Sequence, residues 1–254
     1  MLYDISTFDK CFETMEYMTD FKYWRNLFDV YLYRYVDEPE RMKTEMMDKY
    51  NIRLKKIPYE EISFVLQHVT TSADNCESIR KNGIHDLGWT YSHRTELREF
   101  LDKHDIILDV EGKHLYQHGE EKQTQILKKN SMVWYKFFDD PFVCGNFQID
   151  KEHPYGGNVH LRPEIIYNID SVIDGNIEYE WIETHKAYIV FTKASLIKMK
   201  VFLCMNPNEN NLLDKLFSYA FNSIFYNDIS SDRIGILERN EFIPPSDILR
   251  IESW

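Results

Sequence analysis

The sequence predicts an α+β protein in which a helical segment, residues 1–58, precedes a mixed domain, residues 59–254. Two patterns support this division. Apolar residues in the first fifty positions recur at spacings of three and four, as on one face of a helix. From about residue 62, β-type runs alternate with helical patterns and glycines. The length of 254 residues and the 43% hydrophobic content are typical of a chain that buries a substantial core.

The N-terminal segment contains apolar patterns for three helices, whose aromatic stripes favour core packing over a cofactor site. The first stripe is Phe8, Phe12 and Met15, and the second, with Asp20 as the expected N-cap, is Phe21, Trp24, Leu27, Phe28 and Tyr31. A third helix is expected in the run PERMKTEMMDKY, which begins at Pro39.

Several elements of the mixed domain are also predicted. A strand is expected from Ser63 to Val69, and the helix after it ends at Gly83. Further predictions are a helix in RTELREFLDKH, two short strands around Glu111-Gly112, strands in KAYIVFT and VFLCM, and a helix in NNLLDKLFSYAFNSIF. The C-terminal run RIGILERNEFIPPSDILRIESW predicts a strand, a Pro-Pro break and a further short strand.

Charge and cysteine usage limit the classes of function. A formal net charge of −12 argues against non-specific binding to nucleic acid or anionic membranes. The four cysteines are scattered without a CxxC pair, which favours reduced thiols. We expect a cytoplasmic protein that does not enter the membrane, because no basic and apolar leader occurs and no apolar run approaches roughly 20 residues.

Common catalytic motifs are missing from the sequence. His114 and His118 lie four residues apart, but in a run typical of a strand and turn. Neither CxxC nor HExxH occurs, so we expect no metal site. The sequence also contains no GxSxG nucleophile motif and no GxGxxG phosphate loop.

Two other motifs carry the functional prediction. The run HVTTSADNCESIRKNGI, residues 68–84, resembles the first motif of the ADP-ribosyltransferase superfamily: a strand bearing His, a hydroxyl two residues later, and a helix that ends in Gly and an aliphatic residue. The run RNEFIPPSDILRI, residues 239–251, resembles the last motif, in which a strand carries Glu followed by an aromatic and an aliphatic residue. The similarity is greatest to the poly(ADP-ribose)-polymerase-like, or His-Tyr-Glu, branch.

This resemblance implies a split, mainly antiparallel sheet that binds NAD, and it assigns residue roles. Glu241 takes the place of the catalytic carboxylate, which stabilises an oxocarbenium-like transition state. His68 takes the place of the adenosine-ribose contact, and Thr70 that of a residue that contacts the nicotinamide ribose or braces the loop.

The middle motif has more than one candidate position in the sequence. By the same resemblance, a Tyr stacks on nicotinamide, and Tyr188 is favoured here, with Phe191 or Tyr155 as alternatives. Arg162 is a candidate contact for the pyrophosphate. Residues 85–150 have no counterpart in the family pattern and are expected to be an insertion.

The function implied is that of an NAD-dependent mono-ADP-ribosyltransferase acting on a protein or nucleic acid, in a setting such as bacterial toxin–antitoxin or anti-phage conflict. Relatives that modify arginine carry Glu two residues before the catalytic Glu, whereas this sequence has Arg239, so we expect an acceptor other than arginine. Two alternatives stay open: an NAD glycohydrolase on the same fold, and a catalytically inactive interaction protein.

Overall fold

The structure is a computed structural model that describes residues 1–35, 38–122, 132–152, 158–202, 211–226 and 234–254. The chain divides into two compact units. Unit 1 comprises residues 1–67, 145–153 and 193–236, and unit 2 comprises residues 68–144, 154–192 and 237–254. Unit 1 takes in the predicted helical segment, and unit 2 takes in most of the expected insertion.

The helices of unit 1 follow the predicted apolar stripes. They are α1 (Phe8–Met18), α2 (Trp24–Leu32), α3 (Pro39–Lys49) and α11 (Leu212–Phe225). Pro39 lies in the first turn of α3, where a missing amide costs no hydrogen bond. The predicted cap of α2 is wrong, because the N-cap position is Tyr23 and not Asp20. Thr19 is extended and forms a β-bridge with Leu54, which delays the start of the helix.

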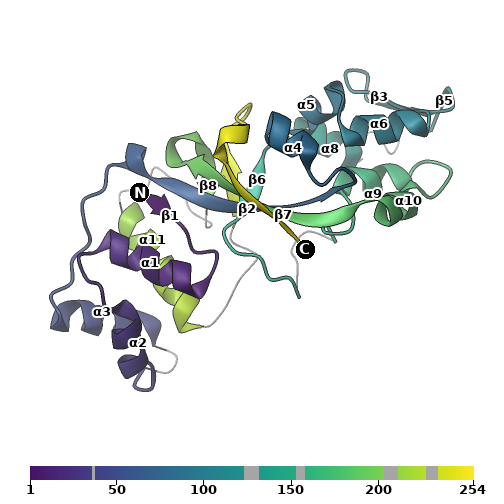
Figure 1. The fold of residues 1–254 in the computed structure, drawn as a ribbon. Coiled ribbons are helices and arrows are strands. Elements are labelled where there is room, and N and C mark those ends of the chain that lie inside the picture. The colour runs from purple at the N-terminus through teal and green to yellow at the C-terminus, as the bar shows by residue number, and fades with distance from the viewer. Residues whose placement is uncertain (36–37, 123–131, 153–157, 203–210, 227–233) are drawn as a thin grey trace. The chain divides into compact units, whose positions relative to one another are not determined.

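Aromatic side chains form the core of unit 1, as the sequence predicts. Helices α1 and α11 lie side by side (Figure 1). The rings of Trp24 and Phe217 lie 5.3 Å apart, and so do those of Phe28 and Phe221. All four side chains are buried. The stripe on α2 is therefore a packing surface.

The strands form a mainly antiparallel sheet in the order β10-β7-β2-β6-β9-β8, with β1 parallel to β2. Their bounds are β1 (Leu2–Tyr3), β2 (Ser63–Ser72), β6 (Cys144–Asn146), β7 (Lys186–Ser195), β8 (Met199–Phe202), β9 (Ile234–Leu237) and β10 (Ile248–Ser253). The predicted strand VFLCM is described as far as Phe202, and its last three residues lie outside the described part. In the register, Gln67 lies opposite Asn146, and Ile251 lies opposite Val190.

Strand β2 runs beyond its predicted end at Val69 and includes the three hydroxyl residues that follow His68. Thr71 and Ser72 are buried, and Thr71 Oγ1 accepts a hydrogen bond from Trp181 Nε1 at 2.8 Å. The strand therefore continues because partners in unit 2 satisfy its hydroxyls.

The remaining elements belong to unit 2. Its helices are α4 (Glu77–Asn82), α5 (Leu87–Ser92), α6 (Glu96–Lys103), α8 (Met132–Phe138), α9 (Glu164–Asp170) and α10 (Ile177–Thr184). A small antiparallel sheet contains β3 (Ile106–Asp109), β4 (His114–Gln117) and β5 (Glu120–Glu121). The sequence predicted α4, α6, β3 and β4. It missed α5, α8, α9 and α10.

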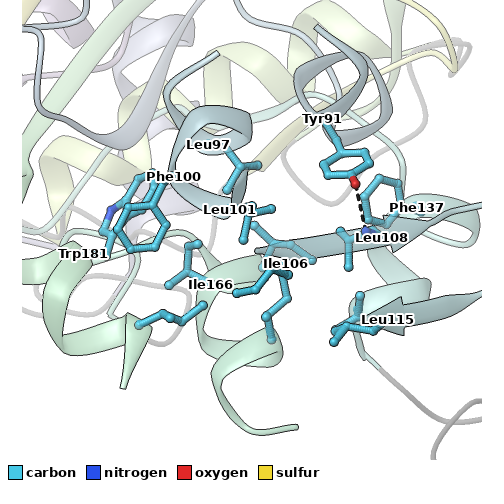
Figure 2. Packing of buried hydrophobic residues seen from close by; sticks show 14 of the residues in the cluster. Tyr91, Leu97, Phe100, Leu101, Ile106, Leu108, Leu115, Phe137, Ile166 and Trp181 are labelled. Atoms are coloured by element: carbon cyan, nitrogen blue, oxygen red, sulfur yellow. Dashed lines mark hydrogen bonds between the residues drawn. The ribbon is translucent and has the colours of Figure 1, made fainter. Parts of the chain in front are cut away.

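The hydrophobic core of unit 2 draws on these short elements (Figure 2). The Phe100 ring meets the Trp181 ring edge to face, with centroids 4.8 Å apart. Tyr91 Oη accepts a hydrogen bond from the Leu108 amide at 2.8 Å, which ties α5 to β3. Residues of the expected insertion thus form part of the core that supports the end of β2.

Candidate functional site

Unit 2 contains a cavity of about 310 Å³ beside the end of β2. Its walls are mostly apolar and come from α4, α5, α6, α9 and α10; they include Ile79, Ile84, Leu97, Ile165 and the two tryptophans Trp89 and Trp181. Polar side chains also line it, namely Thr70, Ser78, Asn82 and Glu96. Apolar walls with a few converging polar groups are typical of small-molecule sites.

Glu96, the first residue of α6, holds the loop that joins β2 to α4. Its Oε1 accepts hydrogen bonds from the amides of Ala73 at 2.9 Å and Asp74 at 2.8 Å, and from Ser72 Oγ at 3.1 Å. Burial, reinforced by the negative charge of Asp74, raises the pKa of Glu96. A partly buried carboxylate therefore fixes the backbone at one wall of the cavity.

The same loop contains backbone of an uncommon conformation. Asn75 and Cys76 have φ angles of 58° and 64°, in the left-handed region. Tyr188 Oη on β7 donates to Asn75 Oδ1 at 2.8 Å, and Ser72 Oγ accepts from the Cys76 amide at 2.9 Å. Such residues persist only where their surroundings hold them, and they cluster at functional sites. Tyr188, the favoured middle-motif residue, is one of the groups that hold this loop.

His68 is buried and has a protein partner on each ring nitrogen. Nδ1 lies 2.7 Å from the Cys144 carbonyl oxygen, and Nε2 lies 2.9 Å from Thr192 Oγ1. A carbonyl only accepts, so Nδ1 carries the proton and Nε2 accepts from the Thr192 hydroxyl. Burial lowers the pKa of His68 to about 4, which keeps the ring neutral at pH 7. A ribose hydroxyl would have to replace one of these two partners.

Of the other predicted binding residues, Thr70 lines the cavity and Arg162 does not. The Arg162 side chain is buried, its Nε lies 2.5 Å from Glu178 Oε1, and its guanidinium covers the Tyr167 ring at 4.6 Å. Arg162 therefore already has a carboxylate partner where we expected a pyrophosphate contact. Tyr155 lies outside the described residues.

The prediction that a strand carries Glu241 is wrong. Strand β9 ends at Leu237, and the Glu241 amide donates to the Glu238 carbonyl at 3.1 Å across a turn in which Asn240 has a φ of 68°. The alternation of side chains along a strand therefore does not apply to Arg239 and Glu241. The Arg239 guanidinium donates to the Phe138 carbonyl at 2.9 Å.

The two predicted motifs nevertheless meet within unit 2. Ile84, at the end of the first motif, and Ile243, two residues after Glu241, exchange both backbone hydrogen bonds at 2.9 Å. Gly83 permits this approach, because a Cβ atom at this position would lie 2.0 Å from the Ile243 carbonyl oxygen. The segment that carries Glu241 thus lies against the segment that ends α4.

The sequence motifs did not predict Glu96, Trp89 or Trp181 as site residues, although all three line the cavity. A signal existed for Glu96, because Thr95 caps α6 by accepting a hydrogen bond from the Arg98 amide, which places Glu96 in the first turn. The two tryptophans lie on α5 and α10, and the sequence did not predict either helix.

Comparisons with protein-family models, with curated proteins and with solved structures found no match for this chain. None of the described helices has the length and apolar character needed to cross a membrane. Within the described residues, no group of three or more His, Cys, Asp or Glu side chains is placed to hold a metal ion.

Proposed function

We propose that the chain is an NAD-dependent mono-ADP-ribosyltransferase that modifies an intracellular macromolecule. The observation that carries the proposal is the pairing of Ile84 with Ile243. The two motifs that resemble the superfamily lie more than 150 residues apart in the sequence, yet this pairing sets the Glu241 segment against the end of the first motif.

The cavity is suited to a small ring of the size of nicotinamide. Trp89 and Trp181 contribute to its apolar lining, and Thr70 and Asn82 offer hydrogen-bonding groups. Thr70 follows His68 by two residues on β2, so the cavity adjoins the predicted first motif. The loop held by Glu96 and Tyr188 gives this wall a fixed shape.

The proposed reaction breaks the bond between nicotinamide and the ribose C1 carbon of NAD. Nicotinamide leaves with the bonding electron pair, the acceptor forms a new bond to C1, and the acceptor releases a proton. Positive charge develops on the ribose in between, and a carboxylate nearby lowers the barrier by stabilising it. Glu241 is the residue to which we assign this role.

A second candidate, a catalytically inactive interaction protein, is favoured by a different observation. His68 and Arg162 both have protein partners at the groups that would contact NAD, and Glu241 follows a turn instead of lying on a strand. A degenerate site that had exchanged ligand contacts for internal ones would have these features.

One experiment separates the alternatives. The pure protein is incubated with NAD labelled in its adenosine half, with and without cell lysate. Label on a macromolecule supports the transferase, free ADP-ribose alone identifies water as the acceptor, and intact NAD supports the inactive protein. Glu241→Gln and Glu238→Gln serve as the test and control variants, because the two residues lie at opposite ends of one turn.

A further inference from the structure

Four rings form a continuous column on unit 2. His85 stacks on Phe242 with centroids 4.6 Å apart and planes 9° apart, and on Trp89 at 3.7 Å and 13°. Trp89 in turn stacks on His93 at 4.0 Å and 15°. The spacing and near-parallel planes are those of stacked bases in a nucleic-acid strand.

Both ends of the column are open to solvent. Phe242 is 39% exposed, and His93 is exposed as well. Within the described residues, each end ring stacks on a single neighbouring ring, and part of each end residue is exposed to solvent. Residues 85, 89 and 93 recur every fourth position across α5 and its two ends, and Phe242 extends the column from the other motif.

Internal hydrogen bonds orient both histidines in the column. His85 Nε2 donates to the Asn82 carbonyl at 2.8 Å, and His93 Nδ1 donates to the Trp89 carbonyl at 2.9 Å. The second nitrogen of each ring, Nδ1 of His85 and Nε2 of His93, has no hydrogen-bond partner among the described residues. The column therefore presents hydrogen-bonding groups at its edge as well as flat faces at its ends.

The charge of this segment differs from that of the whole chain. Residues 80–94 contain three cations, Arg80, Lys81 and Arg94, and one carboxylate, Asp86, in a chain of net charge −12. Arg80 and Lys81 are exposed and have no ion-pair partner in the described part of the chain. Arg94 pairs with Glu99 at 2.6 Å, but both side chains are largely exposed, and such a surface pair can exchange for a phosphate at little cost.

We propose that this ring column is a binding platform for single-stranded nucleic acid. An unpaired base continues the column at an exposed end, and the neighbouring cations contact phosphates, as in other sequence-tolerant platforms. Phe242 directly follows Glu241, so a base stacked at that end is held beside the proposed catalytic carboxylate. Only one consequence of this inference rests on the proposed function, namely that the acceptor of ADP-ribose is a nucleic acid.

Binding can be measured without any turnover, which separates this inference from the proposed enzymatic activity. Fluorescence anisotropy is recorded with labelled single-stranded DNA, single-stranded RNA and a duplex of the same length. The wild-type protein is expected to bind a single strand more tightly than the duplex. His93→Ala and Phe242→Ala are each expected to weaken that binding about tenfold or more, as for the loss of one stacked base.

Tyr33→Ala is the matched control, because Tyr33 is an exposed aromatic residue, 89% accessible, at the end of α2 in unit 1. It should leave the affinity unchanged, and the melting temperatures of all variants confirm that they fold. The inference is overturned if neither single strand binds or if both end-ring variants bind like the wild type. An inactive protein that still binds single strands through the column contradicts the proposed function but not the platform.

Discussion

Gly83 and Ile243 approach each other so closely that no side chain fits between them, because a Cβ atom on residue 83 would lie 2.0 Å from the Ile243 carbonyl oxygen. Gly83 also has a φ of 87°, which disfavours any other residue. The contact joins the two ends of the predicted site, so its loss should affect both stability and function.

Gly83→Ala is therefore expected to lower the free energy of unfolding by about 2–4 kcal/mol, through backbone strain and steric clash together. Gly119→Ala is the control, because Gly119 has a similar φ of 78° but nothing within 4 Å of the added Cβ. Gly119→Ala should lower the free energy of unfolding by about 1 kcal/mol. Urea denaturation of both measures the difference, and equal costs would show that the Ile243 approach is not as close as described.

The pH dependence of stability tests the burial of His68. Burial lowers its pKa from 6.5 to about 4, so below pH 6.5 the unfolded chain takes up a proton that the folded chain does not. The contribution of the neutral, buried His68 to the free energy of unfolding is fully present above pH 6.5. It is lost as the pH falls toward 4, and the total loss is roughly 3 kcal/mol.

His68→Gln keeps an amide in place of the ring but cannot titrate, so its unfolding free energy should depend less on pH over this window. Denaturation curves at a series of pH values decide the matter. A wild-type slope in His68→Gln would mean that His68 is not held neutral.

Removal of the Tyr188 hydroxyl tests whether it fixes the loop between β2 and α4. Tyr188→Phe deletes the hydrogen bond to Asn75 and should cost about 1 kcal/mol of stability. It should also speed amide hydrogen exchange at residues 73–76, whereas Tyr33→Phe, at an exposed hydroxyl, should change neither quantity. Unchanged exchange in Tyr188→Phe would indicate that the hydrogen bonds of Glu96 and Ser72 hold the loop without it.

The sequence predicted long amphipathic elements well and the site geometry only in part. The stripe containing Trp24 and Phe28 spans enough turns to reveal its period, and the structure buries it as predicted. By contrast, α5 and α10 were not predicted, although they supply Trp89 and Trp181 to the cavity.

Tertiary contacts and local backbone conformation explain the remaining differences between the predicted elements and the structure. β2 extends to Ser72 because Trp181 satisfies the hydroxyl of Thr71. The residues around Glu241 form a turn because Asn240 adopts a left-handed conformation, which a motif match to a strand does not reveal. The roles assigned to His68, Thr70, Tyr188, Arg162 and Glu241 remain predictions.

Release of nicotinamide from NAD by Glu241→Gln and Glu238→Gln tests the central claim most directly. The wild-type protein and Glu238→Gln should release nicotinamide at similar rates, while Glu241→Gln should be slower by about 10²–10³-fold, as expected when one group that stabilises the transition state is lost. All three should share one melting temperature. Equal rates in the wild type and Glu241→Gln, or no release by the wild-type protein with any acceptor, would contradict the assignment.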